Sequence, residues 1–507
     1  MKRNKLSIFI ALVAALSMTS CYHEFPNGGG GGTGTANVSF VMVADTPPAT
    51  LGLVSLKVVP TAITLTPSSG TATTFSLNNG NGYSFDLVRL QSDSAYLGTV
   101  SSVPTGSYSS IAVTFSSATL AYFNGTGVAL TNPICPVNAG CIATFAGPFT
   151  ATVTTTQTIS GNAGLGIDIN LADAITVSGT TLSLNLGNTN AASVYTLPRA
   201  NSNLASGQLD LIEDYTGVVS LSGSSITITP APVVGHPPIT ATVNSSTVLD
   251  EDPTLNLCTT PAQGSASSCV SSSQAASLDA ILNSDGTFTA QEIEPLLASP
   301  IVDTVEGTIV SVTNQTQFIM ITTDIIPAAT NSLIGSVTVG TPLTVNLSVG
   351  PNFYVDSKGL PVDNSFPTSY GLFTGSADTT NLFPGQTVAV HVTAFTAGNG
   401  TTTLDTSTAS SVTLRWSRFT ATVSTPGTQL FSVTSLPGYF NFSQASILGV
   451  EIFLGTQGTE GVTNLDGILN GSPPAATPAV GIRALYIEDP ALDFNPAFFA
   501  AKVRQQP

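Results

Sequence analysis

Charge is what this 507-residue chain has least of: only 8% of its residues are Asp, Glu, Lys or Arg, against roughly 25% in an average soluble domain. The solvent-facing side chains must therefore come from Thr, Ser, Asn and Gly, a usage typical of exported β proteins. Twelve basic residues stand against 29 acidic ones, a formal charge of −17. A surface of that sign repels phosphate backbones, so nucleic-acid binding is excluded.

Histidine is almost as scarce, with three in the whole chain. Only His236 and His391 lie in the body of the sequence, and neither is flanked by an acid that could orient it. No G-x-S-x-G motif supplies an activated serine. Glu292 and Glu294 have the spacing of one strand face and leave a glycosidase pair open, although 29 acids produce such pairs by chance. The sequence therefore predicts that the protein is not an enzyme.

The N-terminus lacks a hydrophobic run long enough to span a bilayer. Lys2, Arg3 and Lys5 precede an apolar run of 11 residues at 6–16. A positive start followed by a short apolar core is typical of a cleavable signal peptide and too short for a transmembrane helix. Residues 1–20 are therefore predicted to be a signal peptide.

The stretch MTSC, which ends at Cys21, resembles the lipobox of bacterial lipoproteins. The resemblance implies that Cys21 is diacylated. Its palmitate-type chains would then hold the mature protein on a membrane. Tyr22 follows the cysteine, instead of the Asp that often retains lipoproteins at the inner membrane. This implies the bacterial outer membrane, with the periplasmic or cell-surface face left open. Residues 21–35, rich in Gly and Thr, are then a tether of about 20 Å reach.

Cysteine occurs five times, an odd number. Cys135 lies close to Cys141, and Cys258 lies close to Cys269, which predicts two local disulfides and leaves Cys21 over. Closing such short loops stabilises each hairpin by roughly 2–3 kcal/mol in the chain-entropy model. A zinc site is the alternative, but neither spacing is C-x-x-C and a single histidine lies nearby. The disulfides predict an oxidising compartment outside the cytoplasm.

Beyond the tether the chain is predicted to be all-β. Segments such as NVSFVMVAD and YSSIAVTFSS are rich in β-branched residues, alternate in polarity and end at turn clusters. No segment shows a sustained helical period with caps, although residues 271–282 are compatible with one short helix.

Residues 36–205 resemble the domain of unknown function four-three-eight-two of bacterial lipoproteins. The pattern has an Asp-x-Pro after the first strand and a Pro-x-Gly-x-Tyr turn that leads into a later one. The residues that occupy these places are Asp45, Pro47, Pro104, Gly106 and Tyr108. The resemblance implies a β-sandwich and an envelope location, and it carries no catalytic residues.

The remaining chain shows an internal repeat of about a hundred residues, with starts at Tyr215, Val305 and Arg418. Each repeat has a strand, a polar turn and a second strand, then a strand that ends in an acidic loop, then a hairpin. This order is compatible with three small closed barrels, and the second and third resemble OB-like domains of unknown function. Closed barrels have no free edges, which suits a stalk of tandem units. The expected barrels are residues 206–304, 305–415 and 416–507.

Two acidic segments raise the question of calcium. Residues 283–292 have part of an EF-hand spacing, but Ile281 stands at the first ligand position, so a β-hairpin is predicted instead. The cluster Asp250, Glu251 and Asp252 is the better candidate, because three acids in one loop repel one another unless they are solvated or bind a hard cation. A solvated loop is the default and calcium the alternative; no other cofactor is expected.

The single tryptophan, Trp416, lies beside Arg415 and near Arg418 in LRWSRF. One interpretation is a ligand shelf with cation–π support. The other is packing at the junction of the second and third barrels, which we favour because the motif falls on their boundary.

These features together predict a membrane-anchored envelope lipoprotein with a non-catalytic binding or structural role. Its partners would be the membrane, through the lipid anchor, and an unknown envelope protein or glycan. The alternative is a carbohydrate-recognition or adhesion protein, with or without a dependence on calcium.

Overall fold

The computed structural model covers the chain from residue 34 to residue 505, with gaps. The gaps are 46, 49, 92, 198–210, 232–233, 250–269, 297–301, 329–330, 357–372, 375, 400–402, 426–429, 441–449, 455–478 and 488–496. Several predictions therefore lie outside the described residues: the signal peptide, the lipidated Cys21, the Cys258–Cys269 pair and the calcium candidates Asp250, Glu251 and Asp252.

The described fold is predominantly β, as predicted, and its single α-helix is the short α1 (Leu171–Ala174). Among the residues with a described structure, no helix is long and apolar enough to cross a membrane.

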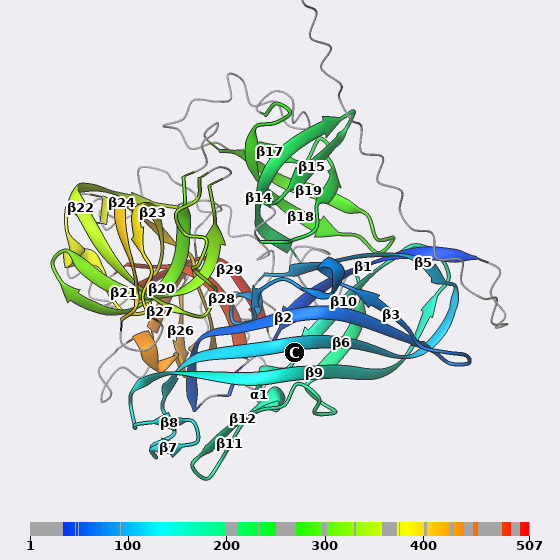
Figure 1. The fold of residues 1–507 in the computed structure, drawn as a ribbon, viewed down its shortest axis with the longest axis horizontal. Helices are drawn as coiled ribbons and strands as arrows, with labels where there is room; N and C mark the ends of the chain where they lie inside the picture. The colour runs from blue at the N-terminus through cyan, green and yellow to red at the C-terminus, as the bar shows by residue number, and fades with distance from the viewer. Residues whose placement is uncertain are drawn as a thin grey trace, which may run out of the picture.

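The first third of the chain forms two sheets that face each other, which we call the two-sheet unit (Figure 1). One sheet has the order β13 (Ala192–Thr196), β10 (Ala163–Ile169), β1 (Thr35–Ala44) and β5 (Ala95–Pro104). The other has the order β3 (Thr73–Ser76), β2 (Leu51–Pro67), β6 (Gly106–Asn124) and β9 (Gly140–Ile159), with β4 (Phe85–Asp86) beside β2. One hydrophobic core joins them, since Phe40 of β1 and Phe115 of β6 are both fully buried within it.

Strand β9 shows how a chain with so little charge builds its outer surface. Ala151 and Val153 are buried, while the alternating Thr152 and Thr154 are exposed. Threonine therefore occupies the solvent positions that Lys and Glu fill in ordinary sheets, as the composition predicted.

A disulfide between Cys135 and Cys141, with Cα atoms 5.9 Å apart, closes the loop between β6 and β9, and this confirms the first predicted pair. The loop carries the hairpin β7 (Leu130–Thr131) and β8 (Ile134–Cys135). A second hairpin, β11 (Ile175–Ser178) and β12 (Thr181–Leu184), follows α1.

The rest of the chain repeats one five-stranded arrangement three times. In each unit the strands neighbour one another in the order first, second, third, fifth, fourth, and the fourth returns to the first. The third and fifth strands are parallel in every case. The repeat predicted from the sequence therefore corresponds to a repeated strand topology.

We name these units barrels 1, 2 and 3. Barrel 1 contains β14 (Leu211–Ser222), β15 (Ser225–Thr229), β16 (Ile239–Thr242), β18 (Ala275–Leu282) and β19 (Phe288–Pro295), with β17 (Val248–Leu249) at its edge. Barrel 2 contains β20 (Thr304–Asn314), β21 (Gln317–Ile326), β22 (Pro342–Val355), β23 (Thr387–Thr396) and β24 (Asp405–Arg415). Barrel 3 contains β25 (Ser417–Thr425), β26 (Leu430–Thr434), β27 (Val450–Leu454), β28 (Ala479–Ile487) and β29 (Ala497–Gln505).

The helix considered for residues 271–282 is wrong, because this segment contributes strand β18. Its residues pair with β14 on one side and β19 on the other. Burial between two strands outweighs the weak helical preference of Ala, Leu and Gln here. The hairpin predicted in place of an EF-hand is confirmed by the antiparallel pairing of β18 with β19.

Candidate functional site

Four arginines gather where the two-sheet unit and the three barrels meet. Arg89 comes from η2 (Arg89–Gln91) of the two-sheet unit, Arg415 from the end of β24, Arg418 from β25 and Arg483 from β28. Ion pairs link them to carboxylates of the two-sheet unit, barrel 1 and barrel 2. These carboxylates are Asp93, Glu213, Asp214, Glu306, Asp324 and Asp356. We call the whole group the arginine–carboxylate cluster.

Barrel 1 supplies two consecutive acids, Glu213 and Asp214, to this one cluster. In a regular strand, neighbouring side chains point to opposite faces. Here the register of β14 against β18 shifts between Ile212 and Tyr215, and Asp214 has a left-handed φ of 55°. Such a bulge re-aims a side chain. The Asp214 N–H donates to Asp279 Oδ1 at 2.9 Å, which holds the bulge in place.

Asp214 then contacts arginines of three units. Its Oδ2 lies 3.5 Å from Arg89 Nη2, 3.1 Å from Arg415 Nη2 and 3.6 Å from Arg418 Nη2. A single carboxylate of barrel 1 therefore bridges the two-sheet unit, barrel 2 and barrel 3.

Glu306, on β20 of barrel 2, makes a similar set of contacts. Its Oε1 lies 3.2 Å from Arg89 Nη1 and its Oε2 lies 3.1 Å from Arg415 Nε. Burial by itself would raise the pKa of Glu306, but Arg89, Arg415 and Arg418 together bring that pKa below its usual value. Glu306 is therefore ionised and paired throughout the physiological range.

Three further ion pairs belong to the cluster. Arg418 Nε lies 2.5 Å from Asp93 Oδ2, which ties barrel 3 to the two-sheet unit. Arg89 Nη1 lies 2.8 Å from Asp324 Oδ2 on β21. Arg415 also pairs with Asp356, just beyond β22. The Arg418–Asp93 and Arg89–Asp324 pairs join units that are not neighbours in sequence, so the units are not arranged as a linear stalk. Where the units meet, their buried charges compensate one another.

Trp416 has no exposed surface, so its indole is not an exposed ligand shelf. It packs in the core of barrel 2 together with Leu485 of barrel 3, and the guanidinium carbon of Arg483 lies 5.0 Å from the centroid of its ring. Arg415 and Arg418 point into the cluster instead of flanking a binding face. The structure thus places the LRWSRF motif at the junction of barrels 2 and 3.

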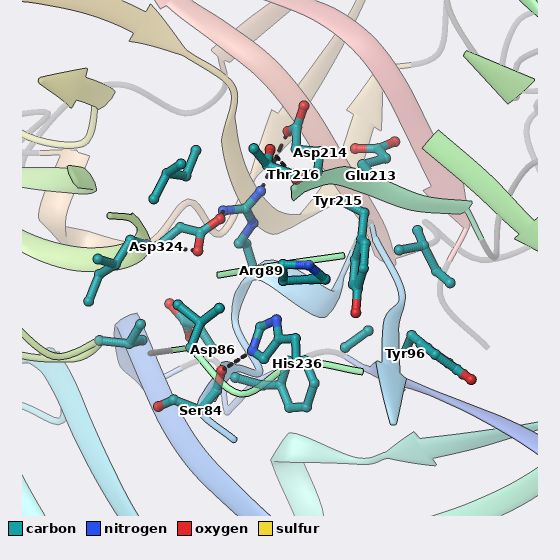
Figure 2. A pocket seen from close by; sticks show the side chains of 18 of the residues that line it. Ser84, Asp86, Arg89, Tyr96, Glu213, Asp214, Tyr215, Thr216, His236 and Asp324 are labelled. Carbon is teal, nitrogen blue, oxygen red and sulfur yellow. Dashed lines mark hydrogen bonds and ion pairs between the residues drawn. The ribbon is translucent and has the colours of Figure 1, made fainter. Parts of the chain in front are cut away.

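A cavity of about 140 Å³ lies beside the cluster, between the two-sheet unit, barrel 1 and barrel 2. Figure 2 shows its walls. Arg89 reaches past it, its guanidinium turned toward Asp324 and Asp214, while Tyr96, Tyr215 and His236 stand on another side.

His236 is held in this wall as a neutral ring. Its Nε2 lies 3.3 Å from the carbonyl oxygen of Ser84, and its ring stacks on Phe85 with centroids 5.0 Å apart. Burial lowers its pKa, and this outweighs the opposing effect of the Asp324 charge. The other candidate base, His391, lies on β23 and is half-buried, and burial lowers its pKa as well.

Asp86 lies in the floor of the cavity. Its Oδ1 accepts from the N–H groups of Leu56 at 2.8 Å and Val88 at 3.0 Å. Burial nevertheless dominates and raises the pKa of Asp86 to about 6. Its charge therefore changes near the lower end of the physiological pH range.

The sequence did not single out Arg89, Glu213, Asp214 or Glu306, although a signal was present. In a chain with 8% charged residues, an arginine inside DLVRLQ or an acid pair inside DLIEDY is conspicuous. A charge embedded in an apolar strand must be paired, since an isolated buried ion is too costly. Within the part of the chain that the structure describes, no group of three or more His, Cys, Asp or Glu is arranged to hold a metal ion.

No protein-family model, curated protein or solved structure matches this chain.

Proposed function

We propose that this chain is a non-catalytic lipoprotein of the bacterial outer membrane that acts as a rigid structural or binding component of the envelope. In this proposal residues 1–20 are removed and Cys21 carries the lipid. The two-sheet unit is the β-sandwich of domain of unknown function four-three-eight-two, and the barrels are OB-like. The strand order shared by the three barrels, with parallel third and fifth strands, supports the OB-like assignment.

The observation that carries the proposal is the arginine–carboxylate cluster. Domains of one chain normally move relative to one another unless their interface is extensive. Here separation would break the ion pairs of Arg483 with Glu213 and of Arg89 with Glu306, each of which joins two units. The four units therefore move as one body. A rigid body of this kind suits a component that holds a partner at a fixed distance and orientation, whereas hinged catalysis needs units that open and close.

The test is expression of the full chain in a Gram-negative host, with palmitate labelling and separation of inner and outer membranes. We expect the wild type to take up label and to sediment with outer membranes. Cys21→Ala should lose both the label and the membrane. Cys135→Ala is the matched control, because it removes another cysteine and should leave both unchanged. An unlabelled wild type, or a Cys21→Ala variant that stays on the membrane, would contradict the anchor.

Proteinase K added to intact cells then assigns the face of the membrane. Degradation of the wild type places the body on the cell surface, and its partner is then sought outside the cell. Protection that ends when the outer membrane is permeabilised places it in the periplasm, and its partner is then an envelope component.

A further inference from the structure

The cavity beside the arginine–carboxylate cluster has the size and walls of a small-molecule site. Its volume of about 140 Å³ is close to that of an engineered cavity of about 150 Å³ that takes up benzene. Tyr215 and His236 stack with centroids 6.4 Å apart, and His236 stacks on Phe85. The phenol of Tyr215 donates to the carbonyl of Pro237, and the phenol of Tyr96 shares a 2.7 Å hydrogen bond with Thr99. With these polar ends engaged, the aromatic groups present mainly their rings to the cavity.

Two side-chain hydroxyls in the wall of the cavity are buried. Ser94, from the two-sheet unit, is 4% exposed, and Thr323, from β21 of barrel 2, is 8% exposed. Neither Ser94 Oγ nor Thr323 Oγ1 has a hydrogen-bond partner in the described part of the protein. Buried polar groups are normally satisfied, so two such hydroxyls on one cavity point to an occupant that forms hydrogen bonds with them.

The charge of the wall selects the sign of that occupant. One arginine, Arg89, lines the cavity, against five carboxylates: Asp86, Asp93, Glu213, Asp214 and Asp324. Among the described residues the whole cluster contains four arginines, and its six carboxylates together with Asp86 outnumber them by three. Electrostatic attraction is stronger away from bulk water, so the surplus favours a cation and opposes an anion.

We propose that this cavity binds a small organic cation, an ammonium group carried on a flat apolar body. The ammonium would donate to Ser94 Oγ and Thr323 Oγ1 near the carboxylates, and the apolar body would lie against Tyr215 and His236, where ring faces also attract cations. This site is independent of the lipid anchor. The binding proposal can therefore be refuted while the proposed lipoprotein function stands, and the lipoprotein function can be refuted while the binding proposal stands.

The experiment is calorimetric titration of the full chain at pH 7.5 with three probes that share a phenyl ring and differ in charge: benzylammonium, benzyl alcohol and benzoate. We expect one benzylammonium per chain, bound at least about 10-fold more tightly than benzyl alcohol because hydrogen bonds to a charged group contribute about 1.5–3 kcal/mol. Benzoate should give no heat of binding. Equal binding of all three would reveal only an apolar void, preference for benzoate would mean that Arg89 governs the site, and no binding would mean a water-filled cavity. Each of these results overturns the proposal.

Matched threonine variants locate the site. Thr323→Val removes a cavity hydroxyl without changing the size of the side chain and should weaken benzylammonium about 10-fold, with benzyl alcohol unaffected. Thr322→Val is the control, since Thr322 Oγ1 is also buried without a partner in the described part of the protein but does not line the cavity. Emission from the single, buried Trp416 verifies that each variant is folded. Equal affinities in the two variants would refute the assignment.

Discussion

Arg483 Nη1 lies 3.2 Å from Glu213 Oε1, and neither side chain has any exposed surface. The pair joins β28 of barrel 3 to β14 of barrel 1, two units that are not consecutive in the chain. Both charges have been removed from water, so each depends on its ion pairs for compensation, and Glu213 has a second one with Arg418 Nη2 at 3.7 Å. This dependence makes the pair the most direct test of the convergent arrangement.

Replacement of one partner should therefore be strongly destabilising. Arg483→Met leaves the Glu213 carboxylate buried without its guanidinium, and we expect the free energy of unfolding to fall by about 3–5 kcal/mol. Urea denaturation followed by Trp416 emission measures the change. The double variant Glu213→Gln, Arg483→Met removes both charges and should recover much of the loss. If the loss of unfolding free energy in the double variant equals the sum of the losses in the two single variants, the two residues do not act as a pair.

Arg89 should control the attachment of the two-sheet unit to barrels 1 and 2. Arg89→Met removes its pairs with Asp214, Glu306 and Asp324. Hydrogen exchange should then rise in β14 and β21, while the inner strands β2 and β6 stay protected because their ladders are intact. Lys57→Met provides a control with the same loss of charge at a residue that forms none of the cluster's ion pairs, and it should leave exchange in β14 unchanged. Faster exchange in β2 and β6 of the Arg89 variant would instead indicate general unfolding.

The titration of Asp86 should make the free energy of unfolding depend on pH in a definite direction. Burial raises its pKa from the ordinary value of 3.8 to about 6 in the folded protein, so the folded state holds the proton more tightly. This group's contribution to stability is therefore present below about pH 4 and is lost as pH rises toward about 6, by about 3 kcal/mol in all. Asp86→Asn keeps an acceptor for Leu56 and Val88 and does not titrate. Relative to the wild type it should gain stability between pH 4 and pH 7, as measured by urea titrations, and parallel curves would contradict the burial argument.

The disulfide between Cys135 and Cys141 should act locally. Replacing both residues with Ala reopens a short loop and should cost about 2 kcal/mol in the chain-entropy model. Urea midpoints with and without a reductant measure the cost. A reductant effect that persists in this double variant would come from the predicted Cys258–Cys269 pair, and removing that pair as well should abolish it.

Local pattern predicted the strands and hairpins because a hairpin joins residues that are close in sequence. β18 with β19, β23 with β24 and β28 with β29 all pair as the alternation and turn residues indicated. The segment 271–282 was ambiguous because Ala and Leu favour either structure, and only its neighbours β14 and β19 decide the outcome.

The cluster could be predicted only in part. The positive charge of Arg415 and Arg418 was visible, but Arg89 and Glu306, for example, are separated by 217 residues. Sequence periodicity contains no information about contacts at that range. Strand alternation alone would place Glu213 and Asp214 on opposite faces of the sheet. Both side chains reach the cluster because the strand has a bulge at this point.

The position of β1 has a mechanical consequence. The described chain enters the two-sheet unit at Thr35, and β1 is paired on both edges, from Val38 to Ala44 with β10 and from Thr35 to Met42 with β5. Tension on the N-terminal side pulls along the axis of this strand, so both ladders must be sheared together and cannot be peeled apart one hydrogen bond at a time. If the chain hangs from its N-terminus, a pulling force therefore meets a strand that is clamped along its length.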